Sequence, residues 1–512
     1  MLLQGFLERA AEQMPDTVGL VCDERRVTYA QLDAEANQLA RALMSLGLGR
    51  NDRAVILCHN DVAPVLGLWA TLKADGVFVI VSASIKADAL AYIVNDCSAR
   101  LLIAEASKAS VVEQALPSCP SVVGVAWADA PAGTLPPTVG SLGLPEVRQA
   151  FDASRPPTRN IDVDLCALVY TSGSTGRPKG VIEAHHNVIS ACTSITAYLG
   201  NSEDDVILGA LPFSSSYGLN QILTATRVGA RVVAVRSTAF PYPIIEAMQR
   251  ERVTGVPGVP TLFATLLSLS IFNGAELPHV RYITNAGAAL PVPYGRQLRA
   301  AFPEARVYAM YGLTECTRVS YLPPEDMDRR PRSIGKGMPN EEVYIVDDLG
   351  NRVGPGVVGE LVVRGSNVMR GYWGCPEDTA LRYRPGPWPG ETVLYTGDLF
   401  TMDEEGFLYF VGRTDDIIKS RGQKVSPREV EDILYELSQV SEAAVVPVDD
   451  GLVGQALHAY LVLKDGQALS ESGVLRHCAG RLEEFKVPQR AFFKESFPRG
   501  ATGKVDKRAL KP

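Results

Sequence analysis

The sequence predicts an α/β protein, and three parts of the chain indicate this fold class. Helical and strand-like patterns alternate from residue 27 to 81 and again from Asp205 to about Val307, which is typical of a sheet covered by helices. Beyond Arg332 the strands are shorter and separated by turns, which favours a small β-barrel. A compact unit of mixed helices and strands follows at the end. The length of 512 residues suggests about three domain-sized units.

The first α/β region begins with two predicted helix–strand units. Residues 29–46 have helical spacing and lead to a strand over 53–58. A second helix over 65–74 leads to a strand over 77–81. The stretch 126–160 is rich in Pro, Ala and Gly, and we expect a long surface connection there.

The remaining predicted elements lie after the second α/β region. Short strands are expected in the barrel region, over 343–346 and 359–363. In the last unit the pattern predicts a helix, two strands and a helix, over 428–437, 443–448, 456–463 and 471–482.

Composition and charge exclude several classes of function. Hydrophobic residues make up 46% and charged residues 21%, which is ordinary for a globular protein with an ample core. The net charge of −8 is spread along the chain without a basic cluster, so nothing favours nucleic acid. No apolar run approaches the roughly 18 residues of a membrane span, and the first residues lack the features of a secretion signal. We expect a cytoplasmic protein.

The cysteines support the same compartment. The nine cysteines are scattered, and none forms a C-x-x-C pair or groups with the six histidines. Buried thiols in a reducing cytoplasm explain them better than a metal site does.

The most informative segment is YTSGSTGRPKG, residues 170–180, between two apolar strand-like segments. Its glycines allow the backbone to approach an anion closely, and its amides and hydroxyls can surround phosphate oxygens. Lys179 adds a compact positive charge. The common pattern G-x-x-x-x-G-K-[ST] is absent, because Pro178 precedes the lysine and no Ser or Thr follows it. A flexible surface turn is the alternative, but the ordered string favours a nucleotide site.

This string resembles the signature loop of the acyl-adenylate-forming enzymes, which include acyl-CoA ligases, adenylation domains of peptide synthetases and firefly luciferase. Further resemblances recur in the same order over nearly the whole chain. They imply a large domain over residues 1–413, with two α/β subdomains and a β-barrel at about 335–412. A small mobile α+β lid over 414–512 is expected to follow.

The segment YGLTE, residues 311–315, matches the family pattern Y-G-x-T-E. By resemblance Tyr311 stacks on adenine, Thr314 contacts the α-phosphate and Glu315 binds Mg²⁺. Mg²⁺ prefers one or two carboxylates beside phosphate oxygens and water, which fits this assignment. In isolation the segment could be a polar turn. Residues 285–289 resemble the small-residue segment that packs against adenine and the acyl pocket.

Two further motifs resemble the ribose site and the hinge. In YTGD, residues 395–398, the resemblance assigns the ribose hydroxyls to Asp398. In GRTDD, residues 412–416, Arg413 also touches ribose and Asp415 is the hinge. An aspartate in a loop is ordinarily a turn residue, so the assignment depends on the pair of motifs. The resemblance as a whole assigns ATP binding to Thr171, Ser172, Gly173, Ser174, Thr175, Gly176, Lys179, Ala288, Tyr311, Gly312, Thr314, Asp398, Arg413 and Lys504.

The C-terminal unit carries two lysines with separate implied roles. Residues 418–425, IKSRGQKV, resemble the loop that faces the active site during thioester formation. Lys419 and the pantetheine-channel residues Arg421, Gly422 and Lys424 lie in it, although a solvated charged face is the alternative. Residues 497–506 resemble the closing motif of the family, with variations at Phe497 and Gly500. Lys504 is then the adenylation lysine, charged at neutral pH.

The lysines Lys419 and Lys504 lie on different faces of one lid in this interpretation. Both cannot occupy the site together, which implies two domain orientations related by rotation about Asp415. The implied catalytic residues are Lys504, Thr175, Glu315 and Lys419, and the implied metal ligand is Glu315.

The acid-binding pocket is expected around residues 211–220 and 256–261 and the segments at Ala288 and Tyr311. Adenylation domains for α-amino acids generally carry an aspartate in the first segment, and none occurs between Leu211 and Leu223. A buried ammonium without a counter-charge is costly. We therefore expect an apolar or aromatic carboxylic acid, bound by Phe213, Ser215, Tyr217, Gly218, Asn220, Gly287 and Ala288.

The thiol acceptor stays open between CoA and the phosphopantetheine arm of a carrier protein, which present the same thiol. Ser215 stands where acyl-CoA and aryl-CoA ligases usually have a histidine. Residues 84–88 resemble the ligase version of the family, which favours CoA. The sequence is also compatible with a luciferase-like oxygenase or with a nucleotide-binding protein that has lost catalysis. A loss of catalysis is disfavoured because the chain retains the residues Lys179, Glu315, Asp398, Arg413 and Lys504.

Overall fold

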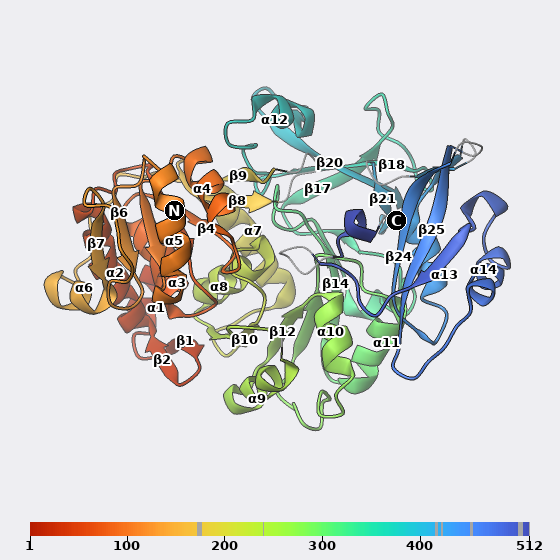
Figure 1. The fold of residues 1–512 in the computed structure, drawn as a ribbon, viewed down its shortest axis with the longest axis horizontal. Helices are drawn as coiled ribbons and strands as arrows, with labels where there is room; N and C mark the ends of the chain where they lie inside the picture. Colours follow the sequence, from red (N-terminus) through yellow and green to blue (C-terminus); the bar gives the residue numbers. More distant parts are fainter. Residues whose placement is uncertain are drawn as a thin grey trace.

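The computed structural model describes residues 1–171, 177–238, 240–414, 418–420, 423–450, 454–499 and 505–510. Two large helix-covered sheets form the N-terminal part, an antiparallel sheet follows, and a small α+β unit lies at the C-terminal end (Figure 1). This arrangement confirms the predicted mixed α/β class with a large N-terminal and a small C-terminal domain.

The first sheet is parallel except for β9, which runs antiparallel to β8. Its inner strands are almost entirely apolar and buried, as expected when helices cover both faces. In spatial order its strands are β7 (Gly140–Gly143), β6 (Gly124–Trp127), β5 (Leu101–Ala104), β3 (Arg53–Leu57), β4 (Val77–Ile80), β8 (Leu165–Thr171) and β9 (Lys179–Ala184). The helices of this region are α2 (Tyr29–Ser45), α3 (Val62–Lys73), α4 (Ala87–Asp96), α5 (Ala109–Ala115) and α6 (Leu144–Ala150), with short 3₁₀ turns η1 (Ala106–Lys108) and η2 (Leu116–Ser118).

The predicted surface connection over 126–160 is wrong in its middle part. Strand β7 pairs with β6, and helix α6 follows it directly. The strand has the sequence GSLG, which shows no alternating pattern, so only its partner strand reveals it. The helix begins with a proline in its first turn, and Glu146 Oε2 accepts a hydrogen bond from Gly143 N at 3.2 Å.

The second sheet is parallel through its centre and begins with the N-terminal hairpin. Strand β1 pairs in parallel with β11, although these strands lie far apart in the sequence. In spatial order the strands are β16 (Lys336–Gly337), β15 (Ser320–Leu322), β14 (Arg306–Tyr311), β13 (Tyr282–Asn285), β12 (Gly255–Gly258), β10 (Val206–Gly209), β11 (Arg231–Ala234), β1 (Val18–Cys22) and β2 (Arg25–Thr28). The helices are α1 (Gly5–Gln13), α7 (His185–Leu199), α8 (Ser216–Val228), α9 (Pro241–Glu251), α10 (Pro260–Leu267), α11 (Val292–Ala301) and the short η3 (Pro324–Asp326).

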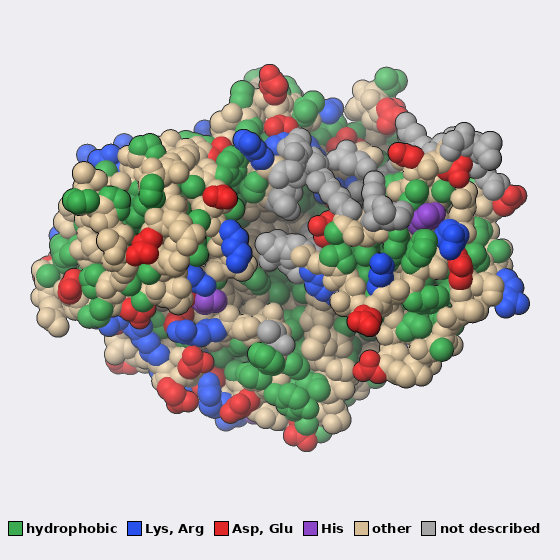
Figure 2. Space-filling model, viewed as in Figure 1, with side chains coloured by type: hydrophobic (Ala, Val, Ile, Leu, Met, Phe, Trp, Pro, Cys, Tyr) green, Lys and Arg blue, Asp and Glu red, His purple; other side chains and the backbone are tan. Residues whose placement is uncertain are grey.

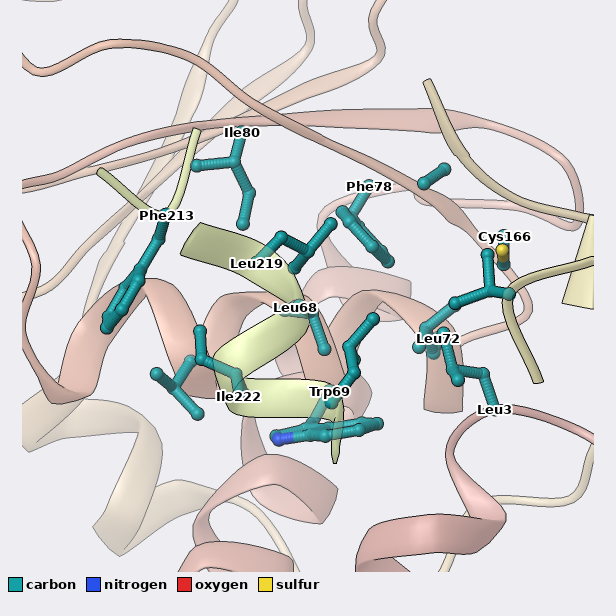
Figure 3. Close-up of a cluster of buried hydrophobic side chains, with 14 of the residues drawn as sticks. Leu3, Leu68, Trp69, Leu72, Phe78, Ile80, Cys166, Phe213, Leu219 and Ile222 are labelled. Carbon is teal, nitrogen blue, oxygen red and sulfur yellow. The ribbon is translucent and has the colours of Figure 1, made fainter. Parts of the chain in front are cut away.

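A shared hydrophobic core joins the two sheets (Figure 3). Trp69 of α3 is fully buried and lies beneath the start of α8, near Leu219 and Ile222. Phe78 of β4 and Phe213, which precedes α8, belong to the same cluster. The segment that leads into α8 is therefore fixed by apolar packing from both sheets.

The antiparallel sheet occupies the region predicted as a β-barrel. Its long strand β20 (Thr392–Met402) pairs with β18 (Gly359–Gly365), β19 (Tyr383–Pro385) and β21 (Leu408–Arg413), and β18 also pairs with β17 (Glu341–Val346). The short helix α12 (Pro376–Arg382) lies before β19, at the top of Figure 1.

The C-terminal unit is α+β, as predicted. Its strands are β23 (Gln423–Val425), β22 (Ile418–Ser420), β25 (Gly454–Leu463), β24 (Val440–Asp450) and β26 (Arg490–Phe493). Its helices are α13 (Pro427–Leu434), α14 (Glu471–Ala479) and the short η4 (Glu484–Lys486) and η5 (Lys507–Leu510). It contacts the N-terminal part where Tyr294 OH of α11 donates a hydrogen bond to Ser441 O of β24 at 3.1 Å.

Two further properties follow from the described residues, which include every cysteine. The cysteines form no disulfide, and all are buried except the half-buried Cys375. Within the described ranges, no helix has the length and apolar character needed to cross a bilayer.

Candidate active site

Two motifs, residues 285–289 and 311–315, meet because their strands end at the same edge of a sheet. Strands β13 and β14 are parallel neighbours, with Asn285 paired to Ala309, so the loops that follow them lie side by side. In the other sheet Thr171 pairs with Lys179 across the β8–β9 hairpin. The intervening predicted residues, Ser172, Gly173, Ser174, Thr175 and Gly176, lie outside the described residues. The space-filling view shows a hollow in the middle of this face of the molecule (Figure 2).

Lys179 and Glu315 are brought together by Tyr372. The Lys179 ammonium lies 5.8 Å from the centre of the Tyr372 ring, and the Tyr372 hydroxyl donates a hydrogen bond to Glu315 Oε1 at 2.6 Å. Burial, and secondarily the nearby Glu315 carboxylate, raises the pKa of Tyr372, so it remains a neutral donor. Lys179 Nζ also pairs with Asp378 Oδ1 of α12 at 2.7 Å. A cation and a carboxylate thus share one small region.

The second polar group of the site is Asp398 with Tyr311 and Arg413. The Tyr311 hydroxyl donates to Asp398 Oδ2 at 2.5 Å, and Arg413 Nε lies 3.6 Å from Asp398 Oδ1. Asp398 and Arg413 face each other across β20 and β21. Burial raises the pKa of Asp398, although the Tyr311 hydrogen bond and the Arg413 charge oppose this change. The Tyr311 ring packs edge-on against Phe400, with ring centres 5.1 Å apart.

The loop after β14 needs its glycine. A Cβ atom on Gly312 would lie 2.6 Å from the carbonyl oxygen of Thr317, which no larger residue could accommodate without a backbone shift. Two residues on, Thr314 Oγ1 lies 3.5 Å from Ser216 Oγ at the start of α8. The YGLTE loop is therefore packed against the predicted acid-binding segment.

Three of the predicted acyl-pocket residues make contacts that stabilise the fold around the start of α8. Ser215 caps α8, because its Oγ accepts a hydrogen bond from Gly218 N at 3.1 Å and donates to Pro212 O at 2.8 Å. Asn220 Nδ2 donates within the same helix to Ser216 O at 2.7 Å. Phe213 is 2% exposed and belongs to the core between the sheets (Figure 3).

The other predicted pocket residues lie just after the C-terminal end of β13 and in the first turn of α8. The Tyr217 hydroxyl hydrogen-bonds to Thr284 Oγ1 at 2.7 Å. Gly287 adopts a φ of +82°, and Ala288 O accepts a hydrogen bond from Asn285 Nδ2 at 2.9 Å. Gly218 is essential to the turn, because a Cβ there would lie 2.1 Å from Pro212 O.

Sequence reasoning missed residues that act from other elements. Tyr372 and Asp378 lie beyond the matched motifs and approach Lys179 only in the folded chain. Asn60 lies in the first sheet region but fixes the segment before α8. Its Nδ2 donates to Leu211 O at 2.8 Å, and its Oδ1 accepts from Phe213 N at 3.0 Å. No local pattern marks these roles.

The C-terminal motifs are described only in part. Lys419 of β22 pairs with Lys424 of β23 in the hairpin register. The predicted residues Asp415, Arg421, Gly422 and Lys504 lie outside the described residues. The chain on either side of 500–504 is anchored, because Arg499 and Val505 form a β-bridge and Phe497 is 5% exposed in a hydrophobic cluster.

A cavity of about 280 Å³ lies where the N-terminal and C-terminal parts meet. Residues of α11, β14, β21 and α13 line it, and four arginines contribute to its wall: Arg296, Arg299, Arg332 and Arg428. Among its lining residues are Asn285 and Ala289, but none of the seven predicted acyl-pocket residues.

The described residues contain no group of three or more His, Cys, Asp or Glu side chains that could hold a metal ion. The Glu315 carboxylate accepts the hydrogen bond from the Tyr372 hydroxyl and is the one carboxylate that the motif offers to a metal ion. This donor set fits a Mg²⁺ ion that arrives bound to nucleotide phosphates, because such an ion needs only one or two protein carboxylates.

Comparison with known proteins decides the family. Residues 7–373 match the family model described as AMP-binding enzyme, and residues 429–504 match the one described as AMP-binding enzyme C-terminal domain. The chain belongs to the AMP-binding enzyme family. It is thereby a member of the acyl-adenylate-forming superfamily that its motifs resemble, and by class an AMP-forming acid–thiol ligase.

Relatives of this AMP-binding enzyme include a synthase, of which the chain covers a small part, and a CoA ligase of similar length. It is 30% identical over 512 residues to tyrocidine synthase 3 of Brevibacillus parabrevis, a match that covers 99% of this chain but 8% of that protein. It is 27% identical over 537 residues to a long-chain-fatty-acid–CoA ligase of Bacillus subtilis (strain 168), covering 99% and 94% of the two chains.

Solved structures of other family members share the fold. ATP-bound MatB from Rhodopseudomonas palustris superimposes with a TM-score of 0.88 at 27% identity, covering 100% of this chain and 98% of MatB. The anthranilate CoA ligase AuaEII in complex with anthranoyl-AMP gives a TM-score of 0.89 at 26% identity, covering 100% and 96%.

Proposed function

We propose that this protein activates a carboxylic acid with MgATP, forms an acyl adenylate with release of pyrophosphate, and transfers the acyl group to a thiol. One observation carries the proposal. The YGLTE segment, which begins at the last residue of β14, joins two chemically different groups: Tyr311 bonds to Asp398, and Glu315 bonds to Tyr372 beside Lys179. A hydroxyl-accepting carboxylate at one end and a cation with a metal-binding carboxylate at the other match the two ends of a nucleotide.

In the first half-reaction a carboxylate oxygen of the acid attacks the α-phosphorus of ATP. The bond from this phosphorus to the β-phosphate bridging oxygen breaks, and pyrophosphate leaves. Lys179 and the signature loop would hold the phosphates, and Glu315 would hold a Mg²⁺ ion, which would screen the developing negative charge. Asp398 and Arg413 hold the ribose so that the reacting atoms stay in line.

In the second half-reaction the thiol sulfur attacks the acyl carbon, the bond to the AMP oxygen breaks and the thiol proton is released. We assign adenylation to Lys504 and thioester formation to the loop of Lys419, Arg421, Gly422 and Lys424. The C-terminal unit, residues 414–512, is expected to change orientation about Asp415 between the two steps. The two family models, which end at residue 373 and begin at 429, leave room for a boundary at about 413.

The substrate is best described as an apolar or aromatic acid without an α-amino group. No aspartate lies between Leu211 and Leu223 to receive an ammonium. The ring of Tyr217 and the cluster of aromatic rings behind it supply an aromatic wall instead. We favour CoA as the acceptor, as in the ligase relatives. A carrier-protein arm is the second candidate, because the chain also matches one module of tyrocidine synthase 3.

A pyrophosphate-exchange assay over a panel of carboxylic acids tests the proposal. At least one acid should support ATP–pyrophosphate exchange, and Glu315→Gln should reduce it by about 10² to 10³. Complete absence of exchange with every acid, under conditions where MgATP binds, would support a nucleotide-binding protein without catalysis. Adding CoA or a phosphopantetheinylated carrier protein to the best acid then identifies the acceptor.

A further inference from the structure

Arg318 is a buried cation that lacks an acidic partner. It follows the YGLTE loop, is 3% exposed, and its Nε has no hydrogen-bond partner. Its Nη1 donates only to the sulfur of Met310, at 3.0 Å. No Asp or Glu oxygen of the described residues lies within the 4.0 Å of an ion pair with this guanidinium.

The contacts that Arg318 does make compensate poorly for its burial. A thioether sulfur is a weak acceptor, and Tyr198 OH donates to the same Met310 sulfur at 3.1 Å. The guanidinium carbon lies 5.0 Å from the centre of the Tyr217 ring, a cation–π contact that is attractive but does not replace an acidic partner. Burial of a charge without a counter-charge is strongly unfavourable. The surrounding cluster is otherwise aromatic or apolar: Tyr198, Tyr217, Tyr308, Tyr321, Met310 and Met338.

The position of Arg318 is next to the acid-binding segment. The Tyr217 ring that it contacts stands in the first turn of α8, and the neighbouring Ser216 approaches Thr314 of the nucleotide loop at 3.5 Å. The backbone of Arg318 itself packs on Gly312, since a Cβ there would lie 2.9 Å from Arg318 Cα. The unpaired charge therefore adjoins the wall that the proposed function assigns to the acid.

We infer that the acid carries a second anionic group, and that this group pairs with the guanidinium of Arg318. This inference rests on the proposed function and narrows its substrate class to acids with an apolar or aromatic body and two acidic groups, such as dicarboxylates. The reacting carboxylate points to the α-phosphate and the second one to Arg318. The same charge disfavours a substrate ammonium, which agrees with the absence of an aspartate between Leu211 and Leu223.

The test compares matched acids on the wild-type enzyme by pyrophosphate exchange. Hexanoic acid is paired with adipic acid, and benzoic acid with isophthalic acid, so that each pair differs only in the second carboxyl group. The monoamides of both diacids serve as neutral analogues of similar shape. We expect kcat/KM for the diacid of at least one pair to exceed that of its monoacid and monoamide by about 100-fold or more, because a site built for a charged group rejects analogues that lack it.

Variants then assign the preference to Arg318. Arg318→Met should lower the diacid-to-monoacid ratio by about 100-fold while the KM for MgATP stays within a few-fold, and Arg318→Lys should retain part of the preference. Arg227→Met is the matched control, because Arg227 also lies over an aromatic ring, Phe6 at 5.4 Å, but in the last turn of α8. Its selectivity should equal that of the wild type.

Several results would overturn the inference and leave the proposed function intact. These are a wild-type preference for monoacids, equal use of diacid and monoamide, or an unchanged ratio in a folded Arg318→Met. Exchange with none of the acids, in contrast, would remove the proposed function and this inference with it. The wild-type comparison remains decisive even where Arg318→Met fails to fold.

Discussion

At the scale of single residues, the Tyr372 hydroxyl couples the cation and the carboxylate of the site. Tyr372→Phe removes one hydrogen bond to Glu315 and leaves the ring beneath Lys179 in place. Hydrogen bonds to charged groups contribute about 1.5 to 3 kcal/mol. We expect kcat/KM for MgATP to fall by about 10-fold to 100-fold in the exchange assay.

The matched control for this variant is Tyr383→Phe. The Tyr383 ring packs edge-on against Tyr372 at 5.8 Å, but its buried hydroxyl has no hydrogen-bond partner among the described residues. Its activity should equal that of the wild type. Equal losses in the two variants would mean that ring packing, rather than the bond to Glu315, controls the activity.

Glu183 of β9 predicts a pH-dependent stability. It is 2% exposed, and burial raises its pKa from 4.5 to about 8. Between these values the folded protein retains a proton that the unfolded chain has released, so stability decreases as pH rises from about 4.5 to 8 and then levels off. At high pH, ionisation of this buried carboxyl group lowers the free energy of unfolding by up to about 5 kcal/mol. Glu183→Gln should remove this cost, so its melting temperature should exceed that of the wild type at pH 8 more than at pH 5.

Melting curves of the two proteins at a series of pH values check this prediction. A constant difference between them across the series would show that the Glu183 carboxyl group does not titrate in this range.

The motif residues could be predicted from the sequence because the family resemblance rests on short strings. Tyr311, Asp398 and Arg413 do lie together in the fold, as their assigned contacts with one nucleoside require. Tyr372, Asp378 and Arg318 were not accessible, because each acquires its neighbours from a different element. An arginine in a sequence carries no sign that its acidic partner is missing.

At the scale of elements, Asn60 from the region of the other sheet adds hydrogen bonds to the apolar packing that holds the segment before α8. Asn60→Ala would remove the hydrogen bonds to Leu211 O and from Phe213 N and leave these backbone groups buried without partners. We expect a loss of about 2 to 4 kcal/mol in stability and a higher KM for the acid, because the start of α8 would be less firmly held. Asn95→Ala, which loses one exposed hydrogen bond to Ser118 O, is the control.

Unfolding by urea and acid-dependent exchange kinetics measure both effects. An Asn60→Ala enzyme with wild-type stability and an unchanged KM for the acid would show that the core between the sheets holds the segment without this residue.

Elements with strong periodicity were predicted well, and elements defined by a distant partner were not. The helix predicted over 29–46 is observed as Tyr29–Ser45, with a capping box between Thr28 and Gln31. The strand predicted over 53–58 is observed as Arg53–Leu57. Strand β7 was missed because its glycines carry no pattern, and the hairpin of β1 and β2 was missed because its partner β11 is remote.

At the scale of the whole molecule, the two lysines of the C-terminal unit predict separable half-reactions. Lys504→Ala should reduce adenylation by about 10² to 10³ but preserve thioester formation from supplied acyl-AMP. Lys419→Ala should show the reverse pattern. Pyrophosphate exchange measures the first step, and release of AMP from synthetic acyl-AMP with CoA measures the second. Equal damage to both steps in either variant would contradict two working orientations of the unit.

The pairing of β1 with β11 has a consequence for biosynthesis. During synthesis strand β1 has no parallel neighbour until Val232 and the residues around it have been made, because Leu20 pairs with Val232. The edge of β1 that later pairs with β11 therefore stays unpaired, or is held by a chaperone, while the residues up to β11 are made. Chains started after Thr28 would be expected to accumulate as aggregates, since the edge of β11 would then stay open to other copies.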